Sequence, residues 1–279
     1  MTGRFAARRA LVTGASRGIG AAVAYRLAAE GADVVVVART ADGRATLPGS
    51  LAETVEKIGV FGTTVGSITA DLTDADQRAG IVGQAELLLG GDIDILVNNA
   101  AVAIYQPLAD FPLRRRRLTF EANVHAPLDL AQAVLPGMRA AGRGWIVNLT
   151  SASARLFPGP PFHLVEPGTA LAVYAASKAA LNRLTNALGA EFLTDGVRVN
   201  AVQPRAAVLT EGAQHLVGET IRPDQLETLE QMVEAVVALC DAPADLTGRI
   251  CVSLDLLAEL GLTARGLDGG ALTGAGATS

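Results

Sequence analysis

Residues 13–20 read Thr13-Gly14-Ala15-Ser16-Arg17-Gly18-Ile19-Gly20 and lie between a short apolar run and a stretch of helical pattern. Glycine permits a tight turn, and it lets main-chain N–H groups and the positive end of the following helix approach a pyrophosphate. The three glycines are spaced G-x-x-x-G-x-G, whereas the common dinucleotide fingerprint is G-x-G-x-x-G. The turn by itself therefore predicts either a phosphate-binding loop or a plain connection from strand to helix.

Outward from this turn, short runs rich in valine and isoleucine alternate with longer stretches of helical pattern. The runs expected to form strands are Ala10–Thr13, Val34–Ala38, Thr64–Ala70, Ile93–Asn98, Trp145–Leu149, Val197–Val202 and Ile250–Val252. Such alternation is typical of a parallel sheet with helices on both faces. The sequence therefore predicts an α/β fold, with one doubly wound domain of about seven parallel strands.

No change in composition divides the chain, so residues 1–263 are expected to form a single domain. Residues 264–279 are rich in glycine and alanine and have little to bury, so a flexible tail is expected there. Four of the 12 prolines lie in Pro158–Gly168, which excludes both a helix and a central strand. We therefore expect a long loop over residues 152–171.

The charge balance and the apolar runs exclude several classes of protein. The chain has 279 residues, and its 23 basic and 28 acidic side chains give a net charge of 23 − 28 = −5, which argues against nucleic acid as a partner. The apolar runs are strand-sized, far shorter than the roughly 18 residues of a membrane helix. Because Arg4, Arg8 and Arg9 stand where a signal peptide would be apolar, we expect a cytoplasmic protein.

The cysteines and histidines do not indicate a metal site. Cys240, Cys251 and three histidines are scattered without metal-ligand spacing, so neither a metal nor a disulfide framework is expected. Cys240 continues the helix-spaced apolar series of Val233 and Val236. It is therefore predicted to be a buried core thiol.

The residues after the second predicted strand indicate which cofactor would be bound. Sites selective for NAD place an acidic side chain about 20 residues after the glycine turn, on the ribose hydroxyls. Here Arg39 follows Gly20 by 39 − 20 = 19 positions, and Thr40 comes next. A guanidinium at this point can pair with a 2′-phosphate, and Arg17 in the turn can approach the same group. This pattern favours NADP(H).

A second pair of residues suggests acid–base chemistry. Tyr174 and Lys178 are four positions apart in a helix-patterned segment, so they share one face. A cation beside a phenol favours the phenolate, and the pair could exchange protons near neutral pH.

Several further motifs accompany this pair: the glycine turn, Asn98-Asn99-Ala100-Ala101, Asn123 and Ser151. Together they resemble the short-chain dehydrogenase/reductase family, from Arg8 to about Leu254. The resemblance implies a Rossmann-like domain and hydride transfer between nicotinamide and a carbonyl or alcohol.

The resemblance also implies catalytic roles. Tyr174 would exchange the proton with the carbonyl oxygen, and Ser151 would hold that oxygen. Lys178 would support Tyr174 and bind the nicotinamide ribose. Asn123 would hold a water that links Lys178 to solvent.

The cofactor residues are assigned in the same way. The pyrophosphate turn would comprise Gly14, Ser16, Arg17, Gly18, Ile19 and Gly20, and Arg39 and Thr40 would lie at the ribose. Asp71 and Leu72 would lie beside the adenine, Asn98 and Ala100 near the adenosine half, Tyr174 and Lys178 at the nicotinamide ribose, and Pro204 near the nicotinamide amide.

Some positions depart from the family pattern. Ser151 and Tyr174 are 174 − 151 = 23 positions apart, about ten more than usual, and the excess is the proline-rich loop. Arg205 follows Pro204 where glycine is usual, Ala101 also replaces a glycine, and Ser253-Leu254-Asp255 replaces a valine-aspartate-glycine ending. The loop is expected to cover the substrate and to offer it the apolar surfaces of Pro160, Pro161, Phe162 and Leu164.

Three functions remain open from the sequence. The first is an NADP(H)-dependent carbonyl reductase or alcohol dehydrogenase acting on a small molecule. The second is a weakly active, cofactor-binding regulatory or scaffold protein. The third is a β-ketoacyl thioester reductase whose acidic carrier would dock on Arg114–Arg117. By resemblance alone, the long helices would form a homodimer or homotetramer.

Overall fold

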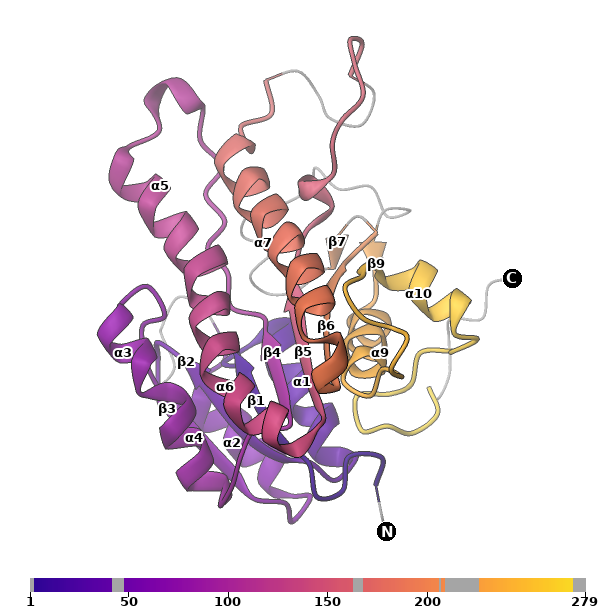
Figure 1. Ribbon diagram of the computed structural model, residues 1–279. Helices are drawn as coiled ribbons and strands as arrows, with labels where there is room; N and C mark the ends of the chain where they lie inside the picture. The colour runs from indigo at the N-terminus through magenta and orange to yellow at the C-terminus, as the bar shows by residue number, and fades with distance from the viewer. Residues whose placement is uncertain (1–2, 42–47, 163–167, 206, 209–225, 273–279) are drawn as a thin grey trace.

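A parallel sheet of seven strands forms the centre of the molecule (Figure 1). The computed structural model describes residues 3–41, 48–162, 168–205, 207–208 and 226–272. The strands lie in the order β3-β2-β1-β4-β5-β6-β9 and all pair in parallel. The predicted doubly wound α/β fold is confirmed, and each of the seven predicted strands is present.

The strands of this sheet are β1 (Arg9–Thr13), β2 (Asp33–Ala38), β3 (Val65–Thr69), β4 (Ile95–Asn98), β5 (Gly144–Leu149), β6 (Val197–Gln203) and β9 (Ile250–Val252). A separate pair is formed by β7 (Ala207–Val208) and β8 (Leu226–Glu227). The α-helices are α1 (Gly18–Ala29), α2 (Leu51–Gly59), α3 (Ala75–Ala79), α4 (Ile81–Leu89), α5 (Leu113–Phe120), α6 (Ala126–Ala141), α7 (Ala172–Glu191), α9 (Leu229–Leu239) and α10 (Ser253–Glu259).

The valine run of β2 shows why this sequence forms a central strand. Val34, Val35, Val36 and Val37 are all fully buried. Val34 and Val36 point to one core cluster, and Val35 and Val37 point to the other, because side chains alternate along a strand. Both faces of the sheet are therefore covered.

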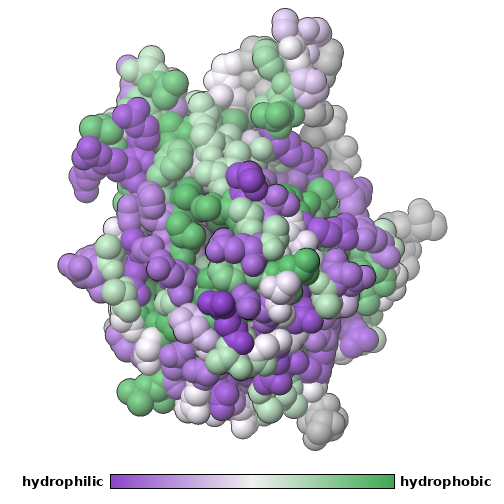
Figure 2. Space-filling model, in the orientation of Figure 1, coloured by the Kyte–Doolittle hydropathy of each residue, from purple (hydrophilic) through white to green (hydrophobic). Residues whose placement is uncertain are grey.

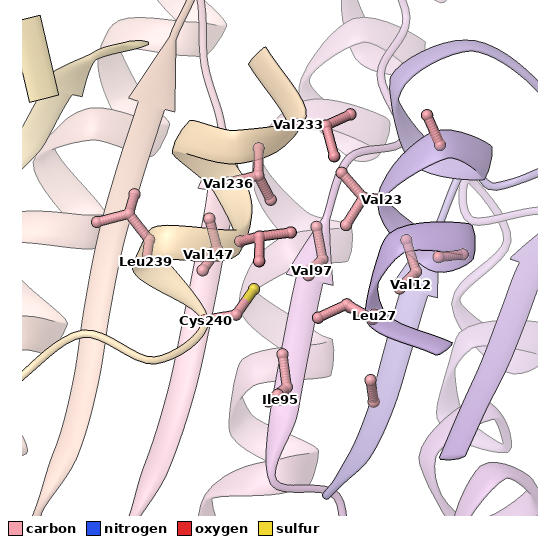
Figure 3. Close-up of a cluster of buried hydrophobic side chains, with 14 of the residues drawn as sticks. Val12, Val23, Leu27, Ile95, Val97, Val147, Val233, Val236, Leu239 and Cys240 are labelled. Atoms are coloured by element: carbon pink, nitrogen blue, oxygen red, sulfur yellow. The ribbon is translucent and has the colours of Figure 1, made fainter. Parts of the chain in front are cut away.

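Each face is covered by its own set of helices. Side chains of α1, α2 and α9 belong to one cluster, and those of α4, α6 and α7 belong to the other or pack against it. Figure 3 shows Val23 and Leu27 of α1 beside Val233 and Val236 of α9, with both helices on the same face of β1, β4 and β5. Cys240 lies in this cluster, so its predicted role as a core thiol is confirmed, and burial raises its pKa to about 12.

The segment predicted to be a flexible tail is packed over its first residues. Arg26 of α1 is fully buried and pairs with Glu30 and Glu234. Its Nη1 also donates to the carbonyl oxygen of Gly266 at 3.0 Å, and Leu267 packs against the first core cluster. A buried guanidinium must have its donors satisfied, and this requirement holds the chain beyond residue 263 in place. Residues 273–279 lie outside the described residues.

The order of the strands places the functional site. The chain proceeds from β1 to β2 and β3 in one direction and then crosses to β4 on the other side of β1. Ligands of such sheets bind at the carboxyl ends of the strands where this reversal occurs. The glycine turn follows β1 at that edge, and Ser151 follows β5. No helix among the described residues is long and apolar enough to cross a membrane.

Candidate active site

The glycine turn lies so close to the segment after β4 that larger residues would not fit. Gly14 has φ +65°, and a Cβ there would lie 2.8 Å from Cα of Ala100. A Cβ at Gly20 would collide with the side-chain amide of Asn99. The turn therefore needs glycine for close packing, as well as for access to a phosphate.

Asn99 and Thr13 hold this turn, and the sequence analysis assigned neither of them a role. Nδ2 of Asn99 donates to the carbonyl oxygens of Thr13 at 2.9 Å and Gly14 at 3.1 Å. The hydroxyl of Thr13 accepts from the main-chain nitrogens of Asn99 and Ala100, both at 3.1 Å. Thr13 ends one predicted strand and Asn99 directly follows another, so the sequence already indicated that both lie at the carboxyl edge of the sheet.

A cleft of about 390 Å³ opens beside the turn. The predicted cofactor residues that line it are Gly14, Ser16, Arg17, Gly18, Ile19, Arg39, Thr40, Asp71, Leu72 and Ala100. Asn99, Ala101 and Val102 also contribute to its wall. The fold thus brings together four segments that are far apart in the sequence.

Not every predicted cofactor residue lines this cleft. The side chain of Asn98 is buried and donates to Oδ1 of Asn148 at 2.9 Å, so it faces the strands and not the cleft. The alternation along β4 turns the Asn98 side chain inward, and the next residues of the predicted segment, Asn99 and Ala100, line the cleft. Tyr174, Lys178 and Pro204 lie outside the lining of this cleft.

Two arginines lie at the cleft without a carboxylate partner among the described residues. Arg17 donates through Nη2 to the carbonyl oxygen of Gly49 at 3.2 Å, and its Nε is buried without a hydrogen-bond partner in the described part of the structure. Arg39 is exposed directly after β2. This orphaned donor and two uncompensated positive charges fit an anionic group.

Arg78 supports the far wall of the cleft, and the sequence analysis missed it. Its Nη1 donates to the carbonyl oxygen of Leu72 at 2.7 Å. Its Nη2 pairs with Glu121 and Asp129, each at 2.7 Å. The buried arginine thus ties the predicted adenine contact to α6 and to the helical turn before it.

The predicted catalytic tyrosine and serine meet. Tyr174 lies in the first turn of α7, and its side chain lies close to that of Ser151. The ring of Tyr105 packs edge-on against that of Tyr174, with 5.7 Å between the centroids. Burial and, to a smaller extent, Tyr105 raise the pKa of Tyr174 to about 12, and Ser151 opposes the shift.

Lys178 has a main-chain partner that the sequence did not predict. The lysine is buried, and its Nζ donates to the carbonyl oxygen of Leu149 at 2.8 Å. Desolvation lowers its pKa to about 8, so it stays largely protonated at neutral pH. Burial raises the pKa of Tyr174, so the phenol keeps its proton near neutral pH. The support of Tyr174 by Lys178 stays a prediction.

Asn123 lies in a π-helical turn, Glu121–His125, that joins α5 to α6. Its Oδ1 accepts from the main-chain nitrogen of Val102 at 2.8 Å, and its Nδ2 donates to the Val102 oxygen at 2.9 Å and to the Ser177 hydroxyl at 3.0 Å. Both amide hydrogens are therefore in use. Asn123 joins a wall of the cleft to the residue next to Lys178.

The two unusual motifs near the last strands compensate for each other. Arg205 pairs with Asp255, and its main-chain nitrogen donates to Glu227. The same buried Glu227 accepts from the hydroxyl of Ser253. Arg205 therefore faces α10, and the residues that replace two family glycines form one polar cluster after Pro204.

The predicted substrate loop projects away from the sheet beyond the start of α7 (Figure 1). Leu156 is 94% exposed and Phe162 is 49% exposed, and Pro160 and Pro161 are also exposed. The structure thus does not bring these residues onto Ser151. Leu164 lies outside the described residues.

The four consecutive arginines lie on α5, which also rises beyond the carboxyl edge of the sheet (Figure 1). All of Arg114–Arg117 are exposed, and Arg115 donates to Gln106 at 2.7 Å. Figure 2 shows the upper part of α7 as a hydrophobic surface beside these projections.

Comparison with known proteins gives a consistent result. The profile of the short chain dehydrogenase family matches residues 8–220. The ketoacyl reductase HetN of Nostoc sp. is 34% identical over 194 residues, which are 70% of this chain and 61% of that protein. The chain thus spans about three fifths of the length of the first curated relatives it matches.

Solved structures are similar over most of their length. A short-chain alcohol dehydrogenase structure from Sinorhizobium meliloti has a TM-score of 0.74 and 32% identity, covering 89% of this chain and 95% of that chain. A structure described as an NAD(P)-dependent gluconate 5-dehydrogenase from Beutenbergia cavernae, with bound NADP, has a TM-score of 0.75 and 30% identity, with 89% and 95% coverage.

Proposed function

Since this chain belongs to the short-chain dehydrogenase family, whose members are nicotinamide-dependent oxidoreductases, we propose that it is an NADP(H)-dependent carbonyl reductase or alcohol dehydrogenase. The observation that carries this proposal is that the side chains of Tyr174 and Ser151 lie close together at the carboxyl edge of the sheet, with buried Lys178 on the same helix as Tyr174. A protein that only binds a cofactor has no need of this arrangement.

The proposed roles follow from the chemistry of these groups. The Ser151 hydroxyl would donate a hydrogen bond to the substrate oxygen and hold it beside Tyr174. Tyr174, protonated because burial raises its pKa, would then donate its proton to the same oxygen. In the oxidative direction it would accept the proton. The nicotinamide, when bound, supplies or accepts the hydride.

Lys178 and Asn123 would act behind these two residues. Lys178 has a pKa of about 8, so it can gain or lose a proton near neutral pH. Because both amide hydrogens of Asn123 are already in use, a water that links Lys178 to solvent would bind the main chain at this turn and not the Asn123 amide nitrogen.

The choice of NADP(H) rests on Arg17 and Arg39. Both border the cleft, and neither pairs with a carboxylate among the described residues. The gluconate dehydrogenase relative holds NADP in its solved structure, which supports the same choice here. The residues of the glycine turn would hold the pyrophosphate, and Asp71 and Leu72 would lie beside the adenine.

A ketoacyl thioester is a second candidate substrate. The HetN relative is named a ketoacyl reductase, and Arg114–Arg117 form an exposed basic surface on α5. An acidic carrier could dock there. Turnover of an acetoacetyl thioester, lowered by alanine at these arginines, would favour this candidate over a simple carbonyl compound.

The quaternary structure and the location stay predictions. The hydrophobic upper part of α7 supports the predicted dimer or tetramer, because an exposed apolar helix surface is typical of an interface. Light scattering of the purified protein would test this. The predicted cytoplasmic location would be tested by fractionation of cells.

The test of the proposed function is NADPH oxidation with a panel of ketones, aldehydes and quinones. We expect turnover of at least one member, and little turnover by Tyr174→Phe under the same conditions. NADPH binding measured by fluorescence serves as the control for folding. Tight binding of NADPH without turnover of any member would favour the regulatory alternative.

A further inference from the structure

Arg155 stands four positions after the catalytic serine, at the end of the short 3-10 turn Ala152–Ala154, and the proposed reaction does not use it. Gln203, a buried residue at the carboxyl end of β6, holds its guanidinium. With the Gln203 amide assigned so that its oxygen faces the guanidinium, this oxygen accepts from Nη2 of Arg155 at 2.7 Å and from Nε at 2.6 Å. The Gln203 nitrogen donates to the carbonyl oxygen of Ser151 at 2.7 Å. One buried amide therefore joins Arg155 to the catalytic residue.

The contact with Gln203 leaves one edge of the guanidinium open. A guanidinium has five N–H donors in a rigid plane, and Gln203 takes two of them on the Nε–Nη2 edge. Two of the remaining three lie on the Nη1–Nη2 edge, which matches the two oxygens of a carboxylate. No acidic side chain in the described ranges pairs with Arg155, and the residue is exposed.

A partner that is both buried and neutral distinguishes Arg155 from other exposed arginines of the chain. Arg4 pairs with Asp241, and Arg139 pairs with Asp195, so the charge of each is compensated. Gln203 is neutral. It fixes the direction of the Arg155 guanidinium without compensating its charge, which lowers the entropy that the side chain would lose on binding an anion.

We propose that Arg155 binds a carboxylate of the substrate, and that the substrate is therefore an oxo acid or the corresponding hydroxy acid. The carboxylate would lie a few bonds from the reacting carbon, since Gln203 connects Arg155 directly to Ser151. Gln203 is then a positioning residue for the guanidinium. This inference rests on the proposed function, because it assumes that Ser151 marks the reacting carbonyl group.

The experiment compares acetoacetate and levulinate with their methyl esters, which keep the carbonyl group and remove the charge. The wild type should prefer each acid. Arg155→Gln should lower kcat/KM for the acids about 10- to 100-fold, and far less for the esters, because a charge-assisted bidentate pair is lost. Arg155→Lys keeps the charge but cannot form two parallel hydrogen bonds, so its kcat/KM for the acids should lie between those of the wild type and Arg155→Gln. Arg183→Gln is the matched control, since it removes an exposed charge whose partner is Asn186 on the same helix.

A second measurement does not depend on turnover. Levulinate should raise the melting temperature of the wild type in the presence of NADP, and Arg155→Gln should abolish this rise while its affinity for NADPH stays unchanged. Equal losses on acids and esters, or weaker NADPH binding by Arg155→Gln, would overturn the inference. If no carbonyl compound is turned over, the proposed function fails, and the stabilisation by levulinate still decides whether Arg155 binds a carboxylate.

Discussion

The side-chain amide of Asn123 forms two hydrogen bonds with the main chain of Val102, one through each of its polar atoms, at 2.8 Å and 2.9 Å. Val102 lines the cofactor cleft, and Asn123 also donates to Ser177, which precedes Lys178. The asparagine thus connects the wall of the cleft to the catalytic helix. This connection explains why a buried amide lies in an irregular, π-helical turn.

Replacing Asn123 should therefore destabilise the protein. Asn123→Ala leaves half-buried main-chain groups of Val102 without their side-chain partner, and we expect the free energy of unfolding to fall by about 1–2 kcal/mol. Urea unfolding followed by circular dichroism measures this change. Ser177→Ala, which removes only one of the partners of Asn123, should have a smaller effect. An unchanged midpoint in Asn123→Ala would contradict the role of this network.

The cofactor preference should depend on Arg39. The wild type should bind NADPH more tightly than NADH by about 1.5–3 kcal/mol, the range for a hydrogen bond to a charged group. Arg39→Asp should narrow or reverse the difference, because a carboxylate repels the 2′-phosphate and can accept from ribose hydroxyls. Fluorescence titration with both cofactors measures it. Equal affinities in the wild type would show that the assignment of NADP(H) is wrong.

Tyr174→Phe removes only the proton that is transferred. We expect turnover to fall by about 10²- to 10⁴-fold, the usual contribution of a general acid, with NADPH affinity largely intact. Lys178→Ala should impair both, since the lysine is also predicted to bind the ribose. Near-normal turnover by Tyr174→Phe on any accepted substrate would remove the tyrosine from the mechanism.

The buried lysine should make stability depend on pH. Its pKa is about 8 in the folded protein, whereas an unfolded lysine keeps the ordinary value of 10.5. Above pH 8 the unfolded chain holds a proton that the folded chain has released, so the free energy of unfolding should rise with pH. Between pH 8 and pH 9 the contribution of Lys178 to this rise should be about 1 kcal/mol.

The control for this effect is Lys178→Met. In this variant the free energy of unfolding should lack the contribution of Lys178 to the rise between pH 8 and pH 9. The buried cysteines, whose pKa values are raised, oppose the rise near pH 9 equally in both proteins, so the difference between the two proteins measures the contribution of Lys178. Urea unfolding at the two pH values measures both proteins. Parallel pH dependences would show that Lys178 titrates normally.

The proline-rich loop should affect the substrate and not the cofactor. Its described part projects from the segment that follows Ser151, beyond the start of α7. Shortening residues 152–171 to the usual family length should raise KM or change the preferred ketone, with NADPH affinity unchanged. Steady-state kinetics over a ketone series measures this. An unaltered substrate profile would show a surface insertion.

Much of the fold could be predicted because it depends on local patterns. Strands such as Val34–Ala38 are runs of branched apolar residues, and the glycine turn requires a conformation that few other residues adopt. The pairing of Tyr174 with Lys178 on one helix face likewise follows from spacing alone. These properties are determined over a few consecutive residues, so the sequence by itself was sufficient.

Only the tertiary structure decided how the site works. The pKa of Tyr174 is raised because its side chain is buried in the folded protein, and Nζ of Lys178 binds the carbonyl oxygen of Leu149. The pairing of Arg205 with Asp255 and the contact of Arg155 with Gln203 join residues about 50 positions apart. Desolvation and long-range contacts of this kind depend on how the elements pack against one another, and no local pattern in the sequence specifies that packing.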